Sequence, residues 1–273
     1  MEKTVAKAIK LLEALAAHER PQRVTELARE LGIAKSNVHR LLQTLVALGH
    51  VRQNEQGLYV ASIRLWEFGS QVAGRLPIQR AAGDHLKRLA ALTTEETQLA
   101  MLDGTDTVYL QAVESAHPVR IASVLGRRVS LHCTAVGKAI LAYQPDAVIR
   151  AMARQLHAFT PRTITTSERL RAELAEIRRG GYAMNLGEWH AGIHGVGAPI
   201  PSPDGTVGAA ISIVGPAERM HARKLRELAP KVVEAAEAIA LSLAYVMARP
   251  EAPPERRLRV ESASAARPPA TAG

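Results

Sequence analysis

Residues 24–51 read VTELARELGIAKSNVHRLLQTLVALGHV, and this stretch decides the fold of the amino-terminal part of the chain. Its apolar positions recur at steps of three and four, the spacing of one helix face; they are Leu27, Ala28, Leu31, Val38, Leu41, Leu42, Leu45 and Leu48. The pattern breaks at Gly32 and Gly49, because glycine readily takes the left-handed backbone that ends a helix. The stretch therefore predicts two helices, over 25–32 and 35–48, with a sharp turn between them.

The segments on either side complete a known order of elements. Upstream, apolar residues at helical spacing predict a helix over Thr4–Ala17. Downstream, two β-prone pieces, His50–Gln53 and Leu58–Ala61, flank the turn sequence NEQG, as a short hairpin requires. Three helices followed by a hairpin is the order of a winged helix-turn-helix, which we expect over residues 1–62.

The outward face of the second helix of this pair carries side chains that suit DNA. A helix-turn-helix lays that helix in the major groove, where arginine pairs with guanine, an amide pairs with adenine, and Ser, Thr or Lys hold phosphates or bases. The candidate contacts to double-stranded DNA are Lys35, Ser36, Asn37, His39, Arg40, Gln43 and Thr44, with Arg52 on the hairpin. The alternative is an ordinary amphipathic helix whose polar face is only solvated.

Charge and cysteine content limit the class of protein. The formal net charge of the 273-residue chain is +9, which favours a polyanionic partner. Cys133 is the only cysteine, so neither an intramolecular disulfide nor a thiolate metal cage can form, which fits a reducing cytoplasm. The first fifteen residues lack the unbroken apolar run of a signal peptide, and the longest apolar run, near 238–248, is too short for a bilayer. We expect a soluble, cytoplasmic protein with no membrane partner.

The rest of the chain predicts a second, mixed domain. A helical segment over 63–76 ends before Pro77 and is the candidate linker helix, and residues 77–248 follow as one domain. Helical patterns lie at 78–91, 136–155, 168–180 and 217–248, and strand patterns lie at 97–115 (with a turn at Gly104), 181–186, 195–200 and 206–215. Strands joined mostly by turns and flanked by helices predict an α+β fold with a largely antiparallel sheet. The Pro-, Ser- and Ala-rich residues 249–273 predict a disordered tail.

No catalytic constellation is complete. A phosphate loop needs Ser or Thr after its lysine, but Ala139 follows Lys138. His190 and His194 have the spacing of two zinc ligands on a helix, yet glycine and no glutamate lies between them. His132 and Cys133 are neighbours that would point to opposite faces of a strand, which predicts a buried, inert thiol. We expect no enzyme activity, no catalytic or metal site and no cofactor.

Several blocks of the sequence resemble the IclR family of bacterial transcriptional regulators. The blocks are residues 24–51, PVRIASVLGRRVSLHCTAVGKAILAY at 118–143, TPRTITTSERLRAELAEIRRGGYAMNLGE at 160–188 and GIHGVGAPIPSPDGTVGAAISIVGP at 192–216. The resemblance implies a winged helix, a linker helix and a GAF-like effector-binding domain. It also implies a homodimer or a dimer of dimers on a palindromic operator, with RNA polymerase as a further partner that such a regulator could contact.

The resemblance places a small-molecule effector in the second domain. The implied effector-binding residues are Ile121, Leu125, Gly126, Val129, Ala135, Val136, Asn185, Gly195, Ser212 and Val214. Free backbone amides at the start of the helix in TAVGK could receive a carboxylate. The alternative is that the small residues there serve only to pack a helix against the sheet.

Three departures from the family pattern affect the expected effector. Asn185 replaces a common acid, Val214 replaces a small polar residue, and Cys133 stands where alanine is frequent. These changes favour a less polar or an aromatic effector, so we expect an organic acid or an aromatic catabolic metabolite. We expect repression more than activation of transcription.

Two other classes of protein compete with this interpretation. One is a metabolite-binding protein or enzyme whose amino-terminal domain makes protein contacts. The other is a general architectural DNA binder, which would leave about 170 residues of mixed structure without a purpose.

Overall fold

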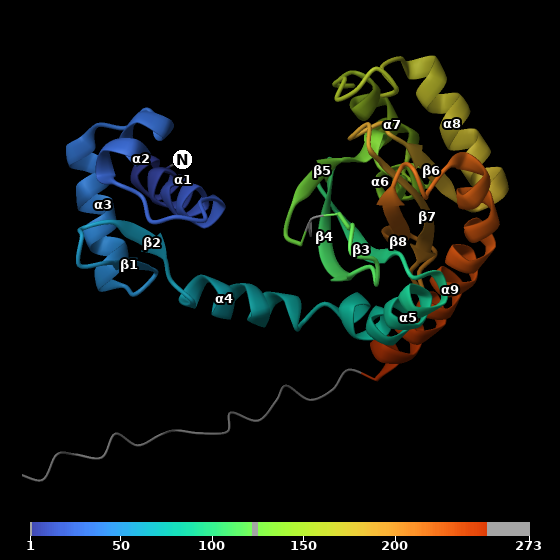
Figure 1. Ribbon diagram of the computed structural model, residues 1–273, viewed down its shortest axis with the longest axis horizontal. Helices are drawn as coiled ribbons and strands as arrows, with labels where there is room; N and C mark the ends of the chain where they lie inside the picture. Colours follow the sequence, from blue (N-terminus) through green and yellow to red (C-terminus); the bar gives the residue numbers. More distant parts are fainter. Residues whose placement is uncertain (1, 122–124, 250–273) are drawn as a thin grey trace, which may run out of the picture. The chain divides into compact units, whose positions relative to one another are not determined.

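The computed structural model describes residues 2–121 and 125–249, and these divide between residues 79 and 80 into two compact units (Figure 1). Helix α5 (Pro77–Thr93) contains the point of division. Except for Arg249, the predicted disordered tail at 249–273 lies outside the described residues.

The first unit begins with the predicted three helices and hairpin. Its elements are α1 (Lys3–Ala17), α2 (Val24–Leu31), α3 (Lys35–Ala47), β1 (Val51–Gln53) and β2 (Tyr59–Ala61). Gly32 ends α2 in the left-handed conformation with φ 62°, and its N–H donates to carbonyls of the last turn of α2. The core contains Leu27, Val38, Leu42 and Leu45 of the helix-turn-helix, which the helical spacing selects, together with Leu11 and Leu15 of α1. On α1 the apolar spacing at Val5 and Ile9 selected the wrong face, because both side chains are exposed. The winged helix-turn-helix is therefore confirmed.

Tyr59 attaches the hairpin to the rest of the first unit. Its side chain is buried, and its backbone exchanges hydrogen bonds with Gln22 at 2.8 and 2.9 Å. Its hydroxyl accepts a hydrogen bond from the side-chain amide of Gln43 on α3 at 3.1 Å. Since Gln43 lies on the second helix of the pair, the wing and that helix are held in a fixed relation.

The second unit is built on a six-stranded sheet in the order β5-β4-β3-β8-β7-β6, and every neighbouring pair is antiparallel. The strands are β3 (Glu96–Asp103), β4 (Asp106–Val113), β5 (Arg128–Ser130), β6 (Ala183–Leu186), β7 (Ile193–Pro201) and β8 (Val207–Pro216). The helices are α5, η1 (Leu131–Cys133, a 3-10 turn), α6 (Ala135–Leu141), α7 (Asp146–Ala153), α8 (Ser167–Gly180) and α9 (Ala222–Ala248). The α+β fold with an antiparallel sheet is confirmed.

Alternation along β3 separates the two faces of this sheet. Thr97 is buried on the face of α5, where its hydroxyl donates to the Leu86 carbonyl at 3.0 Å. Its neighbours Glu96 and Gln98 project to the other face, which α6 covers. This second face carries several of the predicted effector residues.

The structure differs from the sequence prediction at three places in the second unit. The helical pattern at 136–155 forms two helices, because Pro145 disfavours helical backbone at Gln144 and then precedes α7 as its N-cap. The helix expected from 217 begins at Ala222, where the His221 ring accepts from the Lys224 N–H at 3.3 Å. Strand β5 and turn η1 were not predicted, since three residues carry no periodicity.

Within the described part of the chain, no helix combines the length and the apolar character that crossing a membrane requires.

Candidate DNA interface and effector cavity

Helix α3 presents a polar face to solvent. The side chains of Lys35, Ser36, His39, Arg40, Gln43 and Thr44 are exposed, as is Arg52 on β1, and Asn37 is half-buried. Val38, Leu41, Leu42 and Leu45 fix the opposite face of the helix to the core. The sequence prediction therefore placed its eight candidate DNA contacts on accessible surface.

Some of these side chains already have partners. Arg40 donates to the Asn37 amide oxygen at 2.9 Å, one turn away on α3. Gln43 is bound to Tyr59, and the Thr44 hydroxyl donates to the Arg40 carbonyl at 3.1 Å. Arg40 and Asn37 therefore form a pre-arranged donor–acceptor pair, whereas Gln43 and Thr44 serve the structure of the unit as well.

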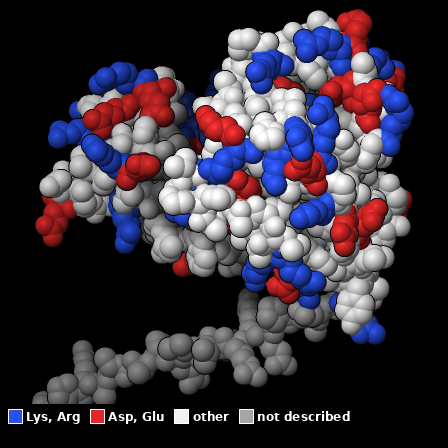
Figure 2. All heavy atoms as spheres, turned by 45° about the vertical axis from the view of Figure 1, so that its right-hand side comes forward, with Lys and Arg blue, Asp and Glu red and all other residues white. Residues whose placement is uncertain are grey.

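On the face that Figure 2 shows, charge by itself does not mark a DNA surface. Figure 2 shows acidic and basic side chains interspersed over the visible face. The donors on α3 therefore support DNA binding more strongly than the formal charge of +9 does.

The register of the sheet explains where a cavity forms in the second unit. Residues directly opposite each other on neighbouring strands share one face. One such row contains Glu96, Val214, Gly195 and Asn185, and a second row, two residues along, contains Gln98, Ser212 and Gly197. Residues that are distant in sequence thus meet in one patch that faces α6.

Two glycines in β7 have no room for a side chain, and one of them, Gly197, lets α6 approach this patch. A Cβ at Gly197 would lie 3.2 Å from backbone atoms of Ala135 and Val136, and a Cβ at Gly195 would lie 2.9 Å from the Ile213 carbonyl oxygen. The first turn of α6 therefore packs on bare backbone, and a hollow is left beside it. Thr134 caps α6, since its hydroxyl accepts from the Gly137 N–H at 3.0 Å.

The cavity brings together seven of the ten predicted effector residues. These are Ile121, Ala135, Val136, Asn185, Gly195, Ser212 and Val214. Leu125, Gly126 and Val129 do not line it. Leu125 is exposed, Gly126 forms a turn with φ 72°, and Val129 is buried in the core below. A Cβ at Gly137 would meet the Leu131 carbonyl, so this glycine makes room for the turn η1 and not for the sheet.

Sequence reasoning missed five residues of the lining. They are Gln98, Tyr109, Thr134, Trp189 and Ile193. Thr134 had a visible signal, because a threonine before a helix is a common cap. Burial raises the pKa of the Tyr109 hydroxyl, which interacts with the Thr134 side chain. Tyr109 and Gln98 reach the cavity only through strand pairing, which the sequence does not display.

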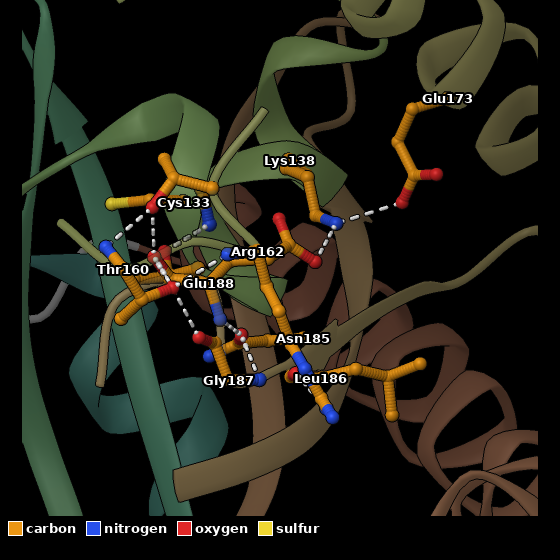
Figure 3. A network of polar contacts seen from close by, with 12 residues as sticks. Cys133, Lys138, Thr160, Arg162, Glu173, Asn185, Leu186, Gly187 and Glu188 are labelled. Atoms are coloured by element: carbon orange, nitrogen blue, oxygen red, sulfur yellow. Dashed lines mark hydrogen bonds and ion pairs between the residues drawn. The ribbon is translucent and has the colours of Figure 1, made fainter. Parts of the chain in front are cut away.

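A buried charge network supports the turn that follows β6, and Asn185 of β6 caps this turn (Figure 3). Lys138 of α6 is 1% exposed, and its ammonium donates to Glu173 and to Glu188, both at 2.7 Å. Asn185 accepts from the N–H groups of Gly187 and Glu188 at 3.0 and 2.8 Å. Burial raises the pKa of the Glu188 carboxyl, and Lys138 opposes this effect. The cavity wall is therefore tied to helices α6 and α8.

Cys133 is buried, as predicted, although the reason given for its inertness was wrong. It lies in the turn η1 and not on a strand. The neighbouring His132 ring contacts the Ser130 hydroxyl at 2.8 Å and the His157 carbonyl at 3.0 Å. Burial raises the pKa of the thiol to about 12, so the thiolate is disfavoured at neutral pH.

His190 and His194 do not face a common point. His190 is exposed, and its ring accepts from the Gly192 N–H at 3.2 Å. His194 is buried in β7, and its ring contacts the Met220 carbonyl at 3.0 Å. Each ring thus has a structural partner of its own.

A winged helix with an exposed, donor-rich second helix, joined to a separate unit that encloses a mixed polar and apolar cavity, defines a DNA-binding regulator with an effector-binding domain. Comparison with known proteins agrees with this class. Residues 4–55 match the IclR helix-turn-helix domain, and residues 70–241 match the bacterial transcriptional regulator IclR C-terminal domain. The chain belongs to the IclR family of bacterial transcriptional regulators.

Individual relatives match along nearly their whole length. The chain is 31% identical to the HTH-type transcriptional regulator XynR of Escherichia coli over 89% of this chain and 97% of the relative. It is 32% identical to the HTH-type regulator KipR of Bacillus subtilis over 89% and 98%. Because this is a family of transcriptional regulators, the alternative of an enzyme is excluded.

Solved structures agree with the fold. The Thermotoga maritima IclR structure has a TM-score of 0.75 and 33% identity, and the match covers 90% of this chain and 100% of that one. An IclR homologue from Microbacterium hydrocarbonoxydans, solved in complex with 4-hydroxybenzoate, has a TM-score of 0.78 and 27% identity, with 89% and 100% covered.

Proposed function

We propose that this protein represses transcription from a palindromic operator and that a small organic acid or aromatic metabolite, bound in the second unit, releases it. The proposed domains are residues 1–62 for DNA, 63–76 as linker and 77–248 for the effector. The observation that carries the proposal is the cavity itself, in which apolar and aromatic side chains surround a few polar groups.

The lining favours a ligand that is largely apolar. Tyr109, Trp189 and Ile193 offer ring and aliphatic surface, whereas Gln98 and Ser212 offer hydrogen bonds. The Microbacterium homologue that binds 4-hydroxybenzoate has the same fold. An aromatic acid fits both observations.

Selection from random DNA with the purified full-length chain tests this function. We expect enrichment of one palindromic sequence, and we expect an aromatic acid to weaken the binding of the protein to this sequence. Sequence-independent binding would contradict the proposal of a specific regulator.

Arg40→Ala should weaken binding to the selected operator by about 1–3 kcal/mol while changing binding to unrelated DNA little, if Arg40 reads a base. The basis is its exposed position on α3 and its pairing with Asn37, which leaves the guanidinium fork pre-oriented. Fluorescence anisotropy at fixed salt measures both affinities. Equal losses on both DNAs would assign Arg40 to a phosphate instead.

The helix after the wing supports a homodimer. No residue of α4 (Arg64–Ala73) is buried, although the helix carries large apolar side chains. Trp66 is 68% exposed, Phe68 is 51% exposed and Val72 is 63% exposed. A ten-residue helix is marginal on its own, and exposed apolar side chains around it mark an interface. A second copy packed against this helix would also supply the second recognition helix that a palindrome needs.

Trp66→Glu combined with Val72→Glu should shift the dimer towards monomer, with a dimer dissociation constant raised at least about tenfold, because two carboxylates would be buried at the interface. Sedimentation at several concentrations measures the shift. Gln71→Glu is the matched control, since Gln71 lies on the polar side of α4. An unchanged dimer in the double variant would place the interface elsewhere.

A further inference from the structure

The cavity described above adjoins a larger hollow at the protein surface, with which it shares lining residues. The inner cavity has about 30 Å³ of space for water-sized molecules, and the outer hollow has about 310 Å³. One water needs roughly 10–15 Å³ on this measure, and ligand sites span roughly 300–1,000 Å³. The inner cavity alone is too small for an aromatic ring, so a ligand must also occupy the outer hollow.

Three residues are common to the two spaces, namely Ile121, Trp189 and Ile193. The Trp189 side chain is half-buried and packs against the core of the second unit. It therefore separates the inner cavity from the outer hollow, and a ligand that joins the two must pass along its ring.

Arg127 lies at the outer side of this ring. Its guanidinium carbon is 5.1 Å from the centre of the Trp189 ring, a cation–π distance. Its backbone is fixed, because the Tyr109 N–H donates to the Arg127 carbonyl at 3.2 Å and the Gly126 N–H donates to the Tyr109 carbonyl at 2.8 Å. The side chain is thus anchored at the mouth of the cavity.

Arg127 differs from two neighbouring arginines, because each of those two forms an ion pair with an acidic side chain. Arg120, also at the outer hollow, pairs with Glu114 at 2.9 Å, and Arg128 pairs with Asp103. Across residues 2–121 and 125–249, no carboxylate lies within ion-pair distance of Arg127. Its guanidinium can therefore accept an incoming anion without breaking an ion pair.

A buried carboxylate beside the cavity lining disfavours an anion in its neighbourhood. Glu96 is 2% exposed beside the lining, and its carboxylate accepts from the Gln98 side-chain amide at 2.7 Å. Burial and the nearby Glu114 raise the pKa of the Glu96 carboxyl, which Gln98 and Arg120 partly oppose. A second negative charge next to Glu96 would raise the electrostatic cost further. An anion is therefore favoured beside Arg127 and disfavoured beside Glu96.

Resting on the proposed function, we infer that Arg127 binds the carboxylate of an apolar monocarboxylate at the mouth, and that the body of this effector reaches past Trp189 into the inner cavity. A guanidinium binds a carboxylate through two parallel hydrogen bonds, which are stronger than its contact with a ring. When Arg127 turns to the carboxylate, the Trp189 ring loses its cation and is free to move aside. Binding of the carboxylate thereby opens the space beside Trp189 into which the body of the ligand extends.

Calorimetric titration of the full-length chain with benzoate, phenylacetate and 4-hydroxybenzoate, each beside its uncharged primary amide, tests this inference. We expect at least one acid to bind about tenfold or more tightly than its amide. In Arg127→Gln that preference should disappear, while binding of the amide stays within about twofold. Arg127 is exposed, so the substitution should leave the fold intact.

Arg128→Gln is the matched control. It removes the same charge at the next residue, and the Arg128 side chain lines neither space. It should keep the preference for the acid. The inference is overturned if Arg127→Gln retains the preference, if amides bind as well as acids, or if no acid binds. In each of these cases, sequence-specific binding to the operator would show that the proposed regulatory function holds although this mode of effector binding is wrong.

Discussion

Lys138→Met should lower the free energy of unfolding of the second unit by about 3–5 kcal/mol, because it leaves the buried Glu188 carboxylate without its cation. Lys138 is 1% exposed and bridges two carboxylates, whereas Glu173 is one-third exposed and can turn to water. One oxygen of Glu188 is already buried without a hydrogen-bond partner. The lost attraction is therefore not replaced locally.

This loss should depend on pH in a defined direction. The pKa of Glu188 is raised by burial in the native protein, and removing Lys138 raises it further. A carboxyl whose folded pKa exceeds its unfolded pKa binds its proton more tightly when folded. Stability is therefore retained below the unfolded pKa and falls as pH rises through the folded pKa. Lys138→Met should be less destabilised at pH 5 than at pH 8.

Urea unfolding at both pH values checks this, with Lys138→Met combined with Glu188→Gln as the matched variant. The double variant should recover much of the loss and most of the added pH dependence, since no buried charge is left alone. A double variant that is no more stable than the single one at pH 8 would contradict the electrostatic explanation.

Gly137→Ala should destabilise the second unit by about 3 kcal/mol, at the upper end of the usual cost of overpacking. A Cβ there would lie 2.4 Å from the Leu131 carbonyl oxygen and 2.8 Å from the Leu131 carbonyl carbon. Both are backbone atoms, so the clash cannot be relieved by rotating a side chain, and η1 must move away from α6.

Gly208→Ala on β8 is the control for Gly137→Ala, because nothing lies within 4 Å of a Cβ at that position. Urea unfolding should show little change for Gly208→Ala. The Gly137→Ala protein should also bind an acid effector more weakly, since the first turn of α6 forms one wall of the cavity. Equal stability of the two variants would show that η1 adapts without cost.

The helices of the first unit were predictable because their information is local. Val38, Leu42 and Leu45 are spaced so that a helix brings them to one face, and the glycine at 32 marks where α2 ends. The predicted bounds of α2 and α3 therefore agree with the structure to within one residue at either end. The short strand β5 was missed because its pairing with β4 comes from residues 20 or more positions away.

The effector residues came from resemblance in separate blocks, and the structure brought seven of the ten to one cavity. Leu125, Gly126 and Val129 were drawn from the block around the turn, where sequence proximity to Ile121 does not imply a shared direction. Gln98 and Tyr109 lie outside those blocks, so neither spacing nor resemblance selected them.

By itself, the sequence determined the order of most elements and the polar face of α3, since helical spacing, turn residues and hydropathy act within a few neighbours. Only the tertiary structure decided which side chains surround the effector cavity and which arginine stands at its mouth. That outcome depends on strand register, which sets Gln98 beside Ser212 and Asn185 beside Gly195 across the sheet. Register is fixed by pairings between residues far apart in the chain, and a one-residue slip would turn every one of these side chains to the opposite face.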